Sequence, residues 1–525
     1  MVPTRRIFSS PGVRIAAASL LSAILLTLTL PDANVWWLTP VALVPWLLAL
    51  ASAGRSRTAF VSGWFMGSVA SAAIYHWIVH TAVTMSDFPV WAAILVLIAF
   101  ALWHGIGWGL VGLFARTAIG NARGIWLVPA AVVAKEFAWP QLFPFHLGNA
   151  YFRVPLLMQG TDLLGIWGAT VVSAAVSVSL AQSLGSGRAH WRRSAWISGV
   201  LVAAWIGYGW IRPLTLTMPN DEVALALIQP DITSAEKKQR SAAKRNEVFE
   251  RLKSLSMQAR GQGVDAVIWP EGAFPYRYTL DAAPQGGYLA QAAEASKELN
   301  RFSTVLETPM IVGAMTRPGN KSRNSMLLID RNGQETARYD KRRLLAFGEY
   351  MPLSDTFPFL KNRVKEVSDM EGGKQVSALV IPPARILPTL CYEALFPEFV
   401  RRALVETDAN LIVNLTNDSW FGDSGEPGQH LMVQYPRAVE MRVPLVRVTM
   451  TGITAVVSPQ GEFLFETDLH ERRADVVHVP IGEGRSVYRS VGPVLPWACL
   501  MVCVTVAAMT GWQRWRVRRA PDKSA

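Results

Sequence analysis

The chain is 525 residues long, 51% of its residues are hydrophobic, and its formal net charge is +12 at pH 7. This length allows two or three domains. A net positive charge of this size first suggests a protein that binds nucleic acid. The positions of the basic residues along the chain argue against that function.

Long apolar runs crowd residues 12–212, recur once near 490–512 and are absent between. A membrane-spanning helix needs about 20 apolar residues. The candidate spans are 13–30, 36–52, 59–80, 90–114, 125–139, 156–184, 194–212 and 490–512. The fifth is short and contains Lys135 and Glu136. The pattern predicts a polytopic α-helical membrane bundle of about eight spans.

Basic residues gather at alternate connections between these spans. The loops at 31–35 and 81–89 carry no Lys or Arg. The other connections and the two ends of the chain carry Arg5, Arg6, Arg14, Arg55, Arg57, Arg116, Arg123, Arg188, Arg192, Arg193, Arg514, Arg516, Arg518, Arg519 and Lys523. Basic loops stay in the cytoplasm. We therefore expect both termini in the cytoplasm and residues 213–489 on the opposite side of the membrane.

Between the seventh and the last expected span, β-rich runs alternate with polar, helix-like stretches. The expected strands are Val223–Ile228, Asp265–Trp269, Pro309–Gly313, Met326–Ile329, Arg385–Leu390, Leu411–Leu415, Leu445–Thr449 and Ala455–Val457. Ala235–Gln258 and Gly287–Arg301 are the expected helices. This alternation predicts one layered α/β domain.

Three reactive residue types follow strand-like runs in this domain. Glu271 follows Val267–Pro270, Lys341 follows Tyr339-Asp340, and Cys391 follows Ile386–Leu390. Taken alone, each residue has an ordinary structural explanation: Glu271 as a surface carboxylate, Lys341 as a solvated lysine and Cys391 as a small buried side chain. Together they supply a base, a cation for an oxyanion, and a nucleophile. Cys391 is also the one cysteine of this domain, because Cys499 and Cys503 fall in the last expected span.

The order Glu, Lys, Cys resembles the nitrilase superfamily, whose triad sits on an αββα sandwich. Together with the membrane spans, the chain looks like a member of the bacterial apolipoprotein N-acyltransferase family. The supporting motifs are Ala226–Ile232 (ALIQPDI), Trp269–Glu271 (WPE), Phe347–Pro352 (FGEYMP), Cys391–Glu393 (CYE) and Thr416–Gly422 (TNDSWFG), followed by Pro427, Gln429, His430, Arg437, Glu440 and Arg442. Lys237-Lys238 stands where the family usually has a Lys-Trp pair.

The resemblance implies the following chemistry. An acyl chain passes from a phospholipid donor to Cys391 as a thioester, and then to the N-terminal amine of a diacylglyceryl-cysteine apolipoprotein. Glu271 is the implied base and Lys341 the oxyanion cation, with help from the Tyr392 backbone amide. Glu349 and Glu393 are expected to position Lys341 and Glu271. The implied location is the bacterial cell inner membrane, with the catalytic domain facing the periplasm.

The sequence also predicts boundaries and partners. We expect a bundle at 1–212, a catalytic domain at 213–486, a final span at 487–512 and a basic tail at 513–525. We expect no nucleic-acid partner, no metal and no cofactor, because no metal-ligand cluster or glycine-rich phosphate loop is apparent.

The residues alone are compatible with two other functions. A membrane-tethered amidase or nitrilase hydrolase would use the same triad with water as acceptor, but an anchor needs only one span. A transporter or scaffold with an inactive domain would more often carry ionisable groups inside its spans.

A lid is expected between Glu349 and the nucleophile strand. Met351–Gly373 is long, and it places Phe357, Phe359 and Leu360 beside Lys361, Arg363 and Lys365. Aromatic residues flanked by basic residues suit the lipid headgroup region. We therefore expect these three apolar residues to admit the acyl chain. The alternative is a surface loop packed on its own domain.

Overall fold

The structure is a computed structural model that describes residues 10–86, 88–185, 190–216, 221–280, 287–352, 354, 356, 369–482 and 484–519. The chain divides into two compact units. The helical unit comprises Met1–His76, Leu95–Arg212 and Val491–Ala525. The α/β unit comprises Trp77–Ile94 and Pro213–Ser490.

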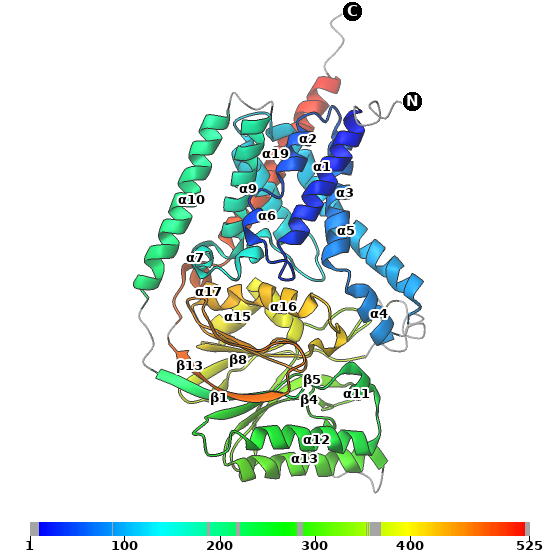
Figure 1. The fold of residues 1–525 in the computed structure, drawn as a ribbon, viewed down its shortest axis with the longest axis vertical. Helices are drawn as coiled ribbons and strands as arrows, with labels where there is room; N and C mark the ends of the chain where they lie inside the picture. Colours follow the sequence, from blue (N-terminus) through cyan, green and yellow to red (C-terminus); the bar gives the residue numbers. More distant parts are fainter. Residues whose placement is uncertain are drawn as a thin grey trace, which may run out of the picture. The chain divides into compact units, whose positions relative to one another are not determined.

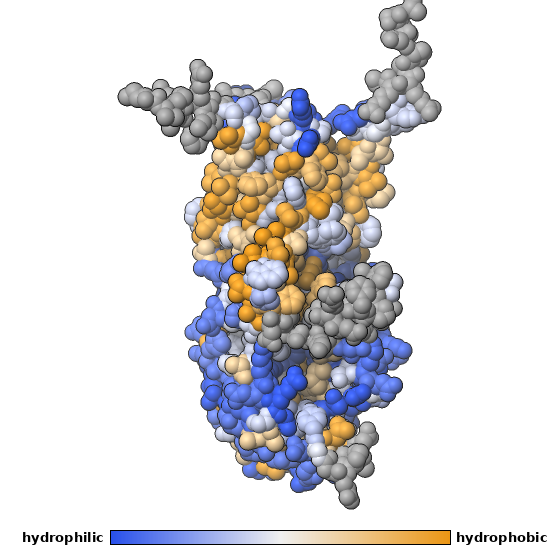
Figure 2. Space-filling view, turned by 90° about the vertical axis from the view of Figure 1, so that its right-hand side faces the viewer, coloured by the Kyte–Doolittle hydropathy of each residue, from blue (hydrophilic) through white to orange (hydrophobic). Residues whose placement is uncertain are grey.

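The helical unit is built from apolar helices joined by short turns. Its elements are α1 (Pro11–Leu28), η2 (Trp36–Leu38), α2 (Val44–Leu50), α3 (Ser56–Ile74), α5 (Val90–Ala118), α6 (Gly124–Ala138), η3 (Leu147–Tyr151), α7 (Pro155–Met158), α8 (Thr161–Leu164), α9 (Ile166–Leu184), α10 (Trp191–Leu214) and α19 (Val494–Arg519). Among the described residues, α1, α5, α9, α10 and α19 are long and apolar enough to cross a membrane. Figure 2 shows apolar residues over much of this unit's visible surface.

Three expected spans differ in detail from the helices. The expected helix at 59–80 ends at Ile74, and a separate helix, α4 (Ile78–Ser86), follows. The expected helix at 156–184 is divided into α7, α8 and α9. Gly165, whose φ is 66°, separates α8 from α9. The run at 36–52 contains the short 3-10 helix η2 and the seven-residue α2 in place of one long helix. The total number of crossings therefore stays a prediction.

The ionisable pair in α6 is accommodated inside the helical unit. The Glu136 carboxylate accepts hydrogen bonds from the Leu147 backbone amide at 2.7 Å and from the Thr170 hydroxyl at 2.9 Å. The Lys135 ammonium lies 5.1 Å from the centroid of the Trp108 ring. Polar groups inside a bilayer must find such partners within the protein, so this charged pair is compatible with a membrane bundle.

The α/β unit contains two sheets. The strands of the first sheet are β1 (Asp221–Gln229), β2 (Ala266–Trp269), β3 (Arg277–Tyr278), β4 (Met310–Thr316), β5 (Arg323–Ile329), β6 (Glu335–Asp340) and β13 (Arg473–Ile481). The strands of the second are β7 (Leu379–Ile381), β8 (Ala384–Leu390), β9 (Leu411–Thr416), β10 (Leu445–Thr449), β11 (Ala455–Val457) and β12 (Phe463–Glu466). All eight expected strands are confirmed, with ends that agree to within three residues.

The strand order differs from the order in sequence. The first sheet runs β13-β1-β2-β4-β5-β6, with β3 paired to β4, and the second runs β12-β11-β10-β9-β8-β7. The central pairs β1–β2, β2–β4, β8–β9 and β9–β10 are parallel. Because parallel strands present their carboxyl ends at one edge of a sheet, residues that follow them come together.

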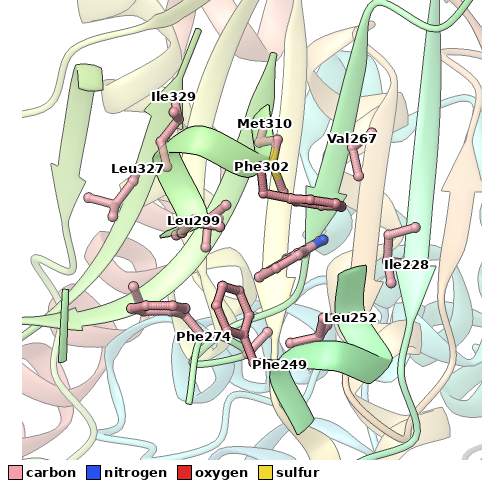
Figure 3. Packing of buried hydrophobic residues seen from close by; sticks show 14 of the residues in the cluster. Ile228, Phe249, Leu252, Val267, Phe274, Leu299, Phe302, Met310, Leu327 and Ile329 are labelled. Carbon is pink, nitrogen blue, oxygen red and sulfur yellow. The ribbon is translucent and has the colours of Figure 1, made fainter. Parts of the chain in front are cut away.

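Helices cover the outer faces of the two sheets (Figure 1). On the first sheet lie α12 (Ala242–Met257) and α13 (Gly287–Leu306); on the second lie α15 (Pro397–Thr407), α16 (Glu426–Gln434) and α17 (Pro436–Met441). This is the expected αββα sandwich. In Figure 3, Phe249 and Leu252 of α12 and Phe302 of α13 pack against Val267 and Met310 of the sheet.

The remaining short elements of this unit are α11 (Ser234–Lys238), η4 (Cys391–Leu395), η5 (Asp418–Trp420) and α18 (Val487–Val491). The expected single helix Ala235–Gln258 is therefore wrong: it is two helices, α11 and α12. The break follows from local chemistry, because Ser241 caps α12 by accepting a hydrogen bond from the Lys244 amide at 3.2 Å. A serine side chain that satisfies a free helical amide favours a helix start.

Candidate active site

Glu271, Lys341 and Cys391 each stand just beyond the end of a strand. Glu271 follows β2 and Lys341 follows β6 in the first sheet, whereas Cys391 follows β8 in the second. The charges of Glu271 and Lys341 both act on the Cys391 thiol. The structure therefore brings together three residues separated by up to 120 positions in the chain.

The loop that carries Glu271 lies directly on strand β4. A Cβ atom on Gly313 would stand 2.2 Å from the Pro270 carbonyl oxygen and 2.7 Å from the Glu271 Cα. The Phe274 amide donates to the Gly313 carbonyl at 3.2 Å. Only glycine leaves room for this approach, so Gly313 fixes the position of the Glu271 backbone.

Lys341 is buried between two carboxylates. Its Nζ lies 2.8 Å from Glu349 Oε1 and 3.2 Å from Glu271 Oε1. Asn324 completes the group, since its Nδ2 donates to Glu271 at 2.7 Å and to Glu349 at 3.1 Å. Burial alone would lower the pKa of Lys341, but the two carboxylates raise it well above its usual value. Lys341 is therefore a fixed cation near neutral pH.

The backbone of Cys391 is held in an unusual conformation. Its φ of 47° lies in the left-handed region, which disfavours residues with a side chain. Its carbonyl oxygen accepts hydrogen bonds from Asn414 Nδ2 at 3.2 Å and from Gln434 Nε2 at 3.3 Å. These two side chains come from β9 and α16 and fix the residue where β8 meets η4.

The Cys391 thiol rests in its neutral form. Burial raises the pKa of Cys391 well above its usual value, the Glu271 charge raises it further, and Lys341 opposes them. A neutral thiol needs a base at the moment of attack. The charge of the buried Glu271 carboxylate acts on this part-exposed cysteine.

Glu393 joins the loop carrying Lys341 to the strand end carrying Cys391. Its buried carboxylate accepts hydrogen bonds from the backbone amides of Arg342 at 2.7 Å, Arg343 at 2.9 Å and Leu390 at 2.8 Å. The Tyr339 hydroxyl also donates to it, at 2.8 Å. Thus Glu349 contacts Lys341 directly, whereas Glu393 acts on the backbone to either side of the site.

A second charged cluster lies behind the cysteine. Oxygen and nitrogen atoms of Asp418, Glu426 and His430 lie within 4.8 Å of one another, and all three side chains are buried. Such a set could bind a metal ion, but Arg447 already donates to Asp418. The Arg447 guanidinium supplies positive charge at this position, which is the balance that buried carboxylates require.

The segment Trp77–Ile94 belongs to the α/β unit although the sequence places it among the spans. Trp77 Nε1 donates to Gln429 Oε1 at 3.2 Å, and the Trp77 ring meets Phe421 edge-on at 5.1 Å between centroids. Phe421 follows η5 and Gln429 precedes His430 in α16. The start of α4 is therefore fixed to the two elements beside the charged cluster.

Local sequence signals did not identify Asn324, Asn414 or Gln434. Asn414 is a polar residue inside the otherwise apolar strand β9, which is a local signal, whereas Asn324 lies between Arg323 and Ser325 in β5 and gives none. The expected lid residues Phe357, Phe359 and Leu360 lie outside the described residues. Tyr392 is described: its side chain is buried and its ring meets Phe396 at 4.8 Å.

Known proteins resemble this chain along most of its length. A family model for the apolipoprotein N-acyltransferase N-terminal domain matches residues 22–179, and a carbon-nitrogen hydrolase model matches residues 224–487. The apolipoprotein N-acyltransferase of Geobacter metallireducens is 32% identical over 94% of this chain and 94% of that protein. The chain belongs to the apolipoprotein N-acyltransferase family.

Other relatives extend this match. The apolipoprotein N-acyltransferase of Rhodopseudomonas palustris is 30% identical over 95% of each chain. Among solved structures, an amidase from Nesterenkonia sp. AN1 is 21% identical, with a TM-score of 0.37, and covers 51% of this chain and 94% of its own. The expected family, the nitrilase-type domain and the acyltransferase class are confirmed. Like its family, the chain is a membrane protein with several apolar helices.

Proposed function

We propose that Cys391, Glu271 and Lys341 are the catalytic residues of an N-acylation of apolipoproteins that passes through a Cys391 thioester. The observation that carries this proposal is the arrangement of the three groups. A neutral thiol stands within the electrostatic reach of one buried carboxylate and one buried, permanently charged amine. This is the set that nucleophilic acyl transfer needs.

In the first half-reaction, Glu271 takes the Cys391 proton and Sγ attacks the ester carbonyl of a phospholipid. Lys341 stabilises the oxyanion, together with the Tyr392 backbone amide. The carbon–oxygen bond of the ester breaks, and the lysophospholipid alkoxide regains the proton from Glu271. In the second half, the N-terminal amine of a diacylglyceryl-cysteine apolipoprotein attacks the thioester carbonyl and Glu271 accepts its proton. The carbon–sulfur bond then breaks, the new amide is released, and the Cys391 thiolate takes the proton from Glu271. Such covalent catalysis gives ping-pong kinetics.

Glu349 and Asn324 hold the side chains of Glu271 and Lys341 in place between the two half-reactions. Both contact Glu271 or Lys341 directly. The Leu345 amide in turn donates to Glu349 Oε2 at 2.8 Å, which fixes that carboxylate to its own loop. A proton can then move between Cys391 and Glu271 without rearrangement of their neighbours.

The proposal places the α/β unit in the periplasm and both termini in the cytoplasm of the bacterial inner membrane. Contacts inside the helical unit support this side assignment. Arg116, at the end of α5, donates to the Ala53 and Gly54 carbonyls at 2.9 and 2.8 Å. Gln182, near the end of α9, donates to the Ile119 carbonyl at 2.9 Å. Three connections expected in the cytoplasm thus meet at one end of this unit.

Intact mass spectrometry tests the proposal. The purified enzyme mixed with phospholipid should gain the mass of one acyl chain, and Cys391→Ser should gain none. A diacylglyceryl peptide should then remove the acyl group and become heavier by the same mass. If water cleared the adduct equally fast without peptide, and the peptide stayed unmodified, the chain would be a hydrolase. If the wild type formed no adduct, the thioester mechanism would be wrong.

A further inference from the structure

Lys237 joins two loops that surround the reactive cysteine. Its Nζ donates to the carbonyl oxygen of Gly272, the residue after Glu271, at 3.4 Å. Two donors, Lys237 Nζ and Trp420 Nε1, face one end of the Asn417 side-chain amide. With the amide oxygen placed at that end, the orientation that satisfies both donors, the oxygen lies 3.0 Å from Lys237 Nζ. One amine thereby connects the loop after β2 in the first sheet with the loop after β9 in the second.

The helix that carries Lys237 is itself fixed on three sides. A capping box between Thr233 and Glu236 starts α11. Arg251 of α12 pairs with Glu236 at 2.9 Å. The Ser234 hydroxyl donates to the Ser419 carbonyl in η5. These contacts fix the helix from which the Lys237 side chain extends.

The carboxylates nearest to Lys237 in the sequence and in η5 are already paired with other basic residues. Its own helix offers Glu236, but Arg251 and Lys244 already pair with that carboxylate, at 2.9 Å each. In η5, Asp418 is bonded to Arg447. Glu271 is the carboxylate whose charge acts on Lys237, and no described carboxylate lies within ion-pair distance of its Nζ.

We propose that Lys237 is a positioning residue for thioester formation, which holds the Glu271 and Asn417 loops together and adds a second positive charge beside Lys341. This inference rests on the proposed function. As Cys391 gives its proton to Glu271, the negative charge passes to Sγ and then to the carbonyl oxygen of the donor. A cation near that path speeds the step when it stabilises the charge on Sγ and on the carbonyl oxygen more than the charge on Glu271.

The protonation of Lys237 makes the proposal measurable. Burial lowers the pKa of Lys237 to about 8, against the opposing charge of Glu271. Below about pH 8 the amine is charged; above it the charge and one donor are lost. The pKa values of Lys341 and Cys391 both lie well above their usual values, so neither group titrates in this window. The rate of adduct formation should therefore fall as the pH rises through about 8.

The experiment compares Lys237→Met, Lys237→Arg and the neighbouring control Lys238→Met, whose side chain is exposed. The measured quantity is the rate of acyl adduct formation with phospholipid in mixed micelles between pH 6.5 and 9.5. Lys237→Met should slow the reaction about tenfold at pH 7, equal to about 1.4 kcal/mol in the barrier. Lys237→Arg should stay near the wild-type rate and lose the decline above pH 8, because arginine does not titrate there.

Lys238→Met should match the wild type in rate and pH profile. Wild-type behaviour of Lys237→Met would overturn the inference and leave the proposed function intact. An equal loss in Lys237→Arg and Lys237→Met, or an unchanged decline in Lys237→Arg, would also overturn it, since charge is the claimed property. Absence of any adduct in the wild type would instead refute the proposed function. Thermal unfolding of each variant separates lost activity from lost fold.

Discussion

Lys341→Met should destabilise the α/β unit as well as stop acyl transfer. The side chains of Lys341, Glu271 and Glu349 are only 3%, 9% and 12% exposed. Removing the cation leaves two buried carboxylates without a partner, and breaking a buried ion pair costs about 3–5 kcal/mol. For a unit of roughly 300 residues, each kcal/mol shifts the melting temperature by about 1.6 °C, so this loss lowers it by about 5–8 °C.

A second substitution separates the two effects. Glu349→Gln added to Lys341→Met removes one of the two unpaired charges and should restore about half of the lost stability. It should restore no activity, because the oxyanion still lacks its cation. Lys321→Met is the control, since its pair with Asp369 at 2.9 Å is largely exposed and should shift the melting temperature by less than about 2 °C.

The measurements are thermal unfolding of the purified protein by intrinsic fluorescence and adduct formation by intact mass. A melting temperature for Lys341→Met within about 2 °C of the wild type would show that the carboxylates are not left as buried charges. A double variant less stable than Lys341→Met alone would also show that Glu349 is not left as an unpaired buried charge.

Three further outcomes are expected. Cys391→Ser should abolish turnover and keep the fold, because a hydroxyl is a much weaker nucleophile than a thiol beside a base; near-normal acyl transfer would remove Cys391 from the mechanism. Glu271→Gln should fail at or before thioester formation, and an adduct accumulating at the wild-type rate would contradict this. Replacing Phe357, Phe359 and Leu360 by Ser should weaken activity on membrane-embedded phospholipid but spare a short soluble ester; equal loss on both substrates would refute the lid.

Local patterns in the sequence predicted eight of the described strands and drew attention to the three reactive residues. They did not predict β3, β6, β7, β12 or β13. The runs before Glu271 and Cys391 are apolar and β-rich, so the sequence itself marks where each strand ends. Catalytic groups at strand ends need no knowledge of distant contacts. The long apolar runs likewise predicted membrane-spanning helices, because continuous runs of about 20 apolar residues are uncommon in soluble proteins.

Helix boundaries were less well determined by the sequence. The expected helix at 59–80 stops at Ile74, and the segment from Trp77 onward joins the α/β unit. The helices on the two sides of this break, α3 and α4, are similarly apolar. The partners that decide it are Phe421 and Gln429, more than 340 residues later in the chain.

Only the tertiary structure decided which polar residues support the site. Asn324, Asn414, Gln434 and Lys237 lie in four different elements, and each acts on a residue distant in sequence. Their roles depend on the strand order β1-β2-β4-β5-β6 and β10-β9-β8, which places the ends of β2, β6, β8 and β9 around one point. The sequence by itself predicted Cys391, Glu271 and Lys341 as nucleophile, base and cation, because each follows a strand-like run. Their supporting hydrogen bonds cross between strands, helices and sheets, and no local pattern records which segments the fold will bring together.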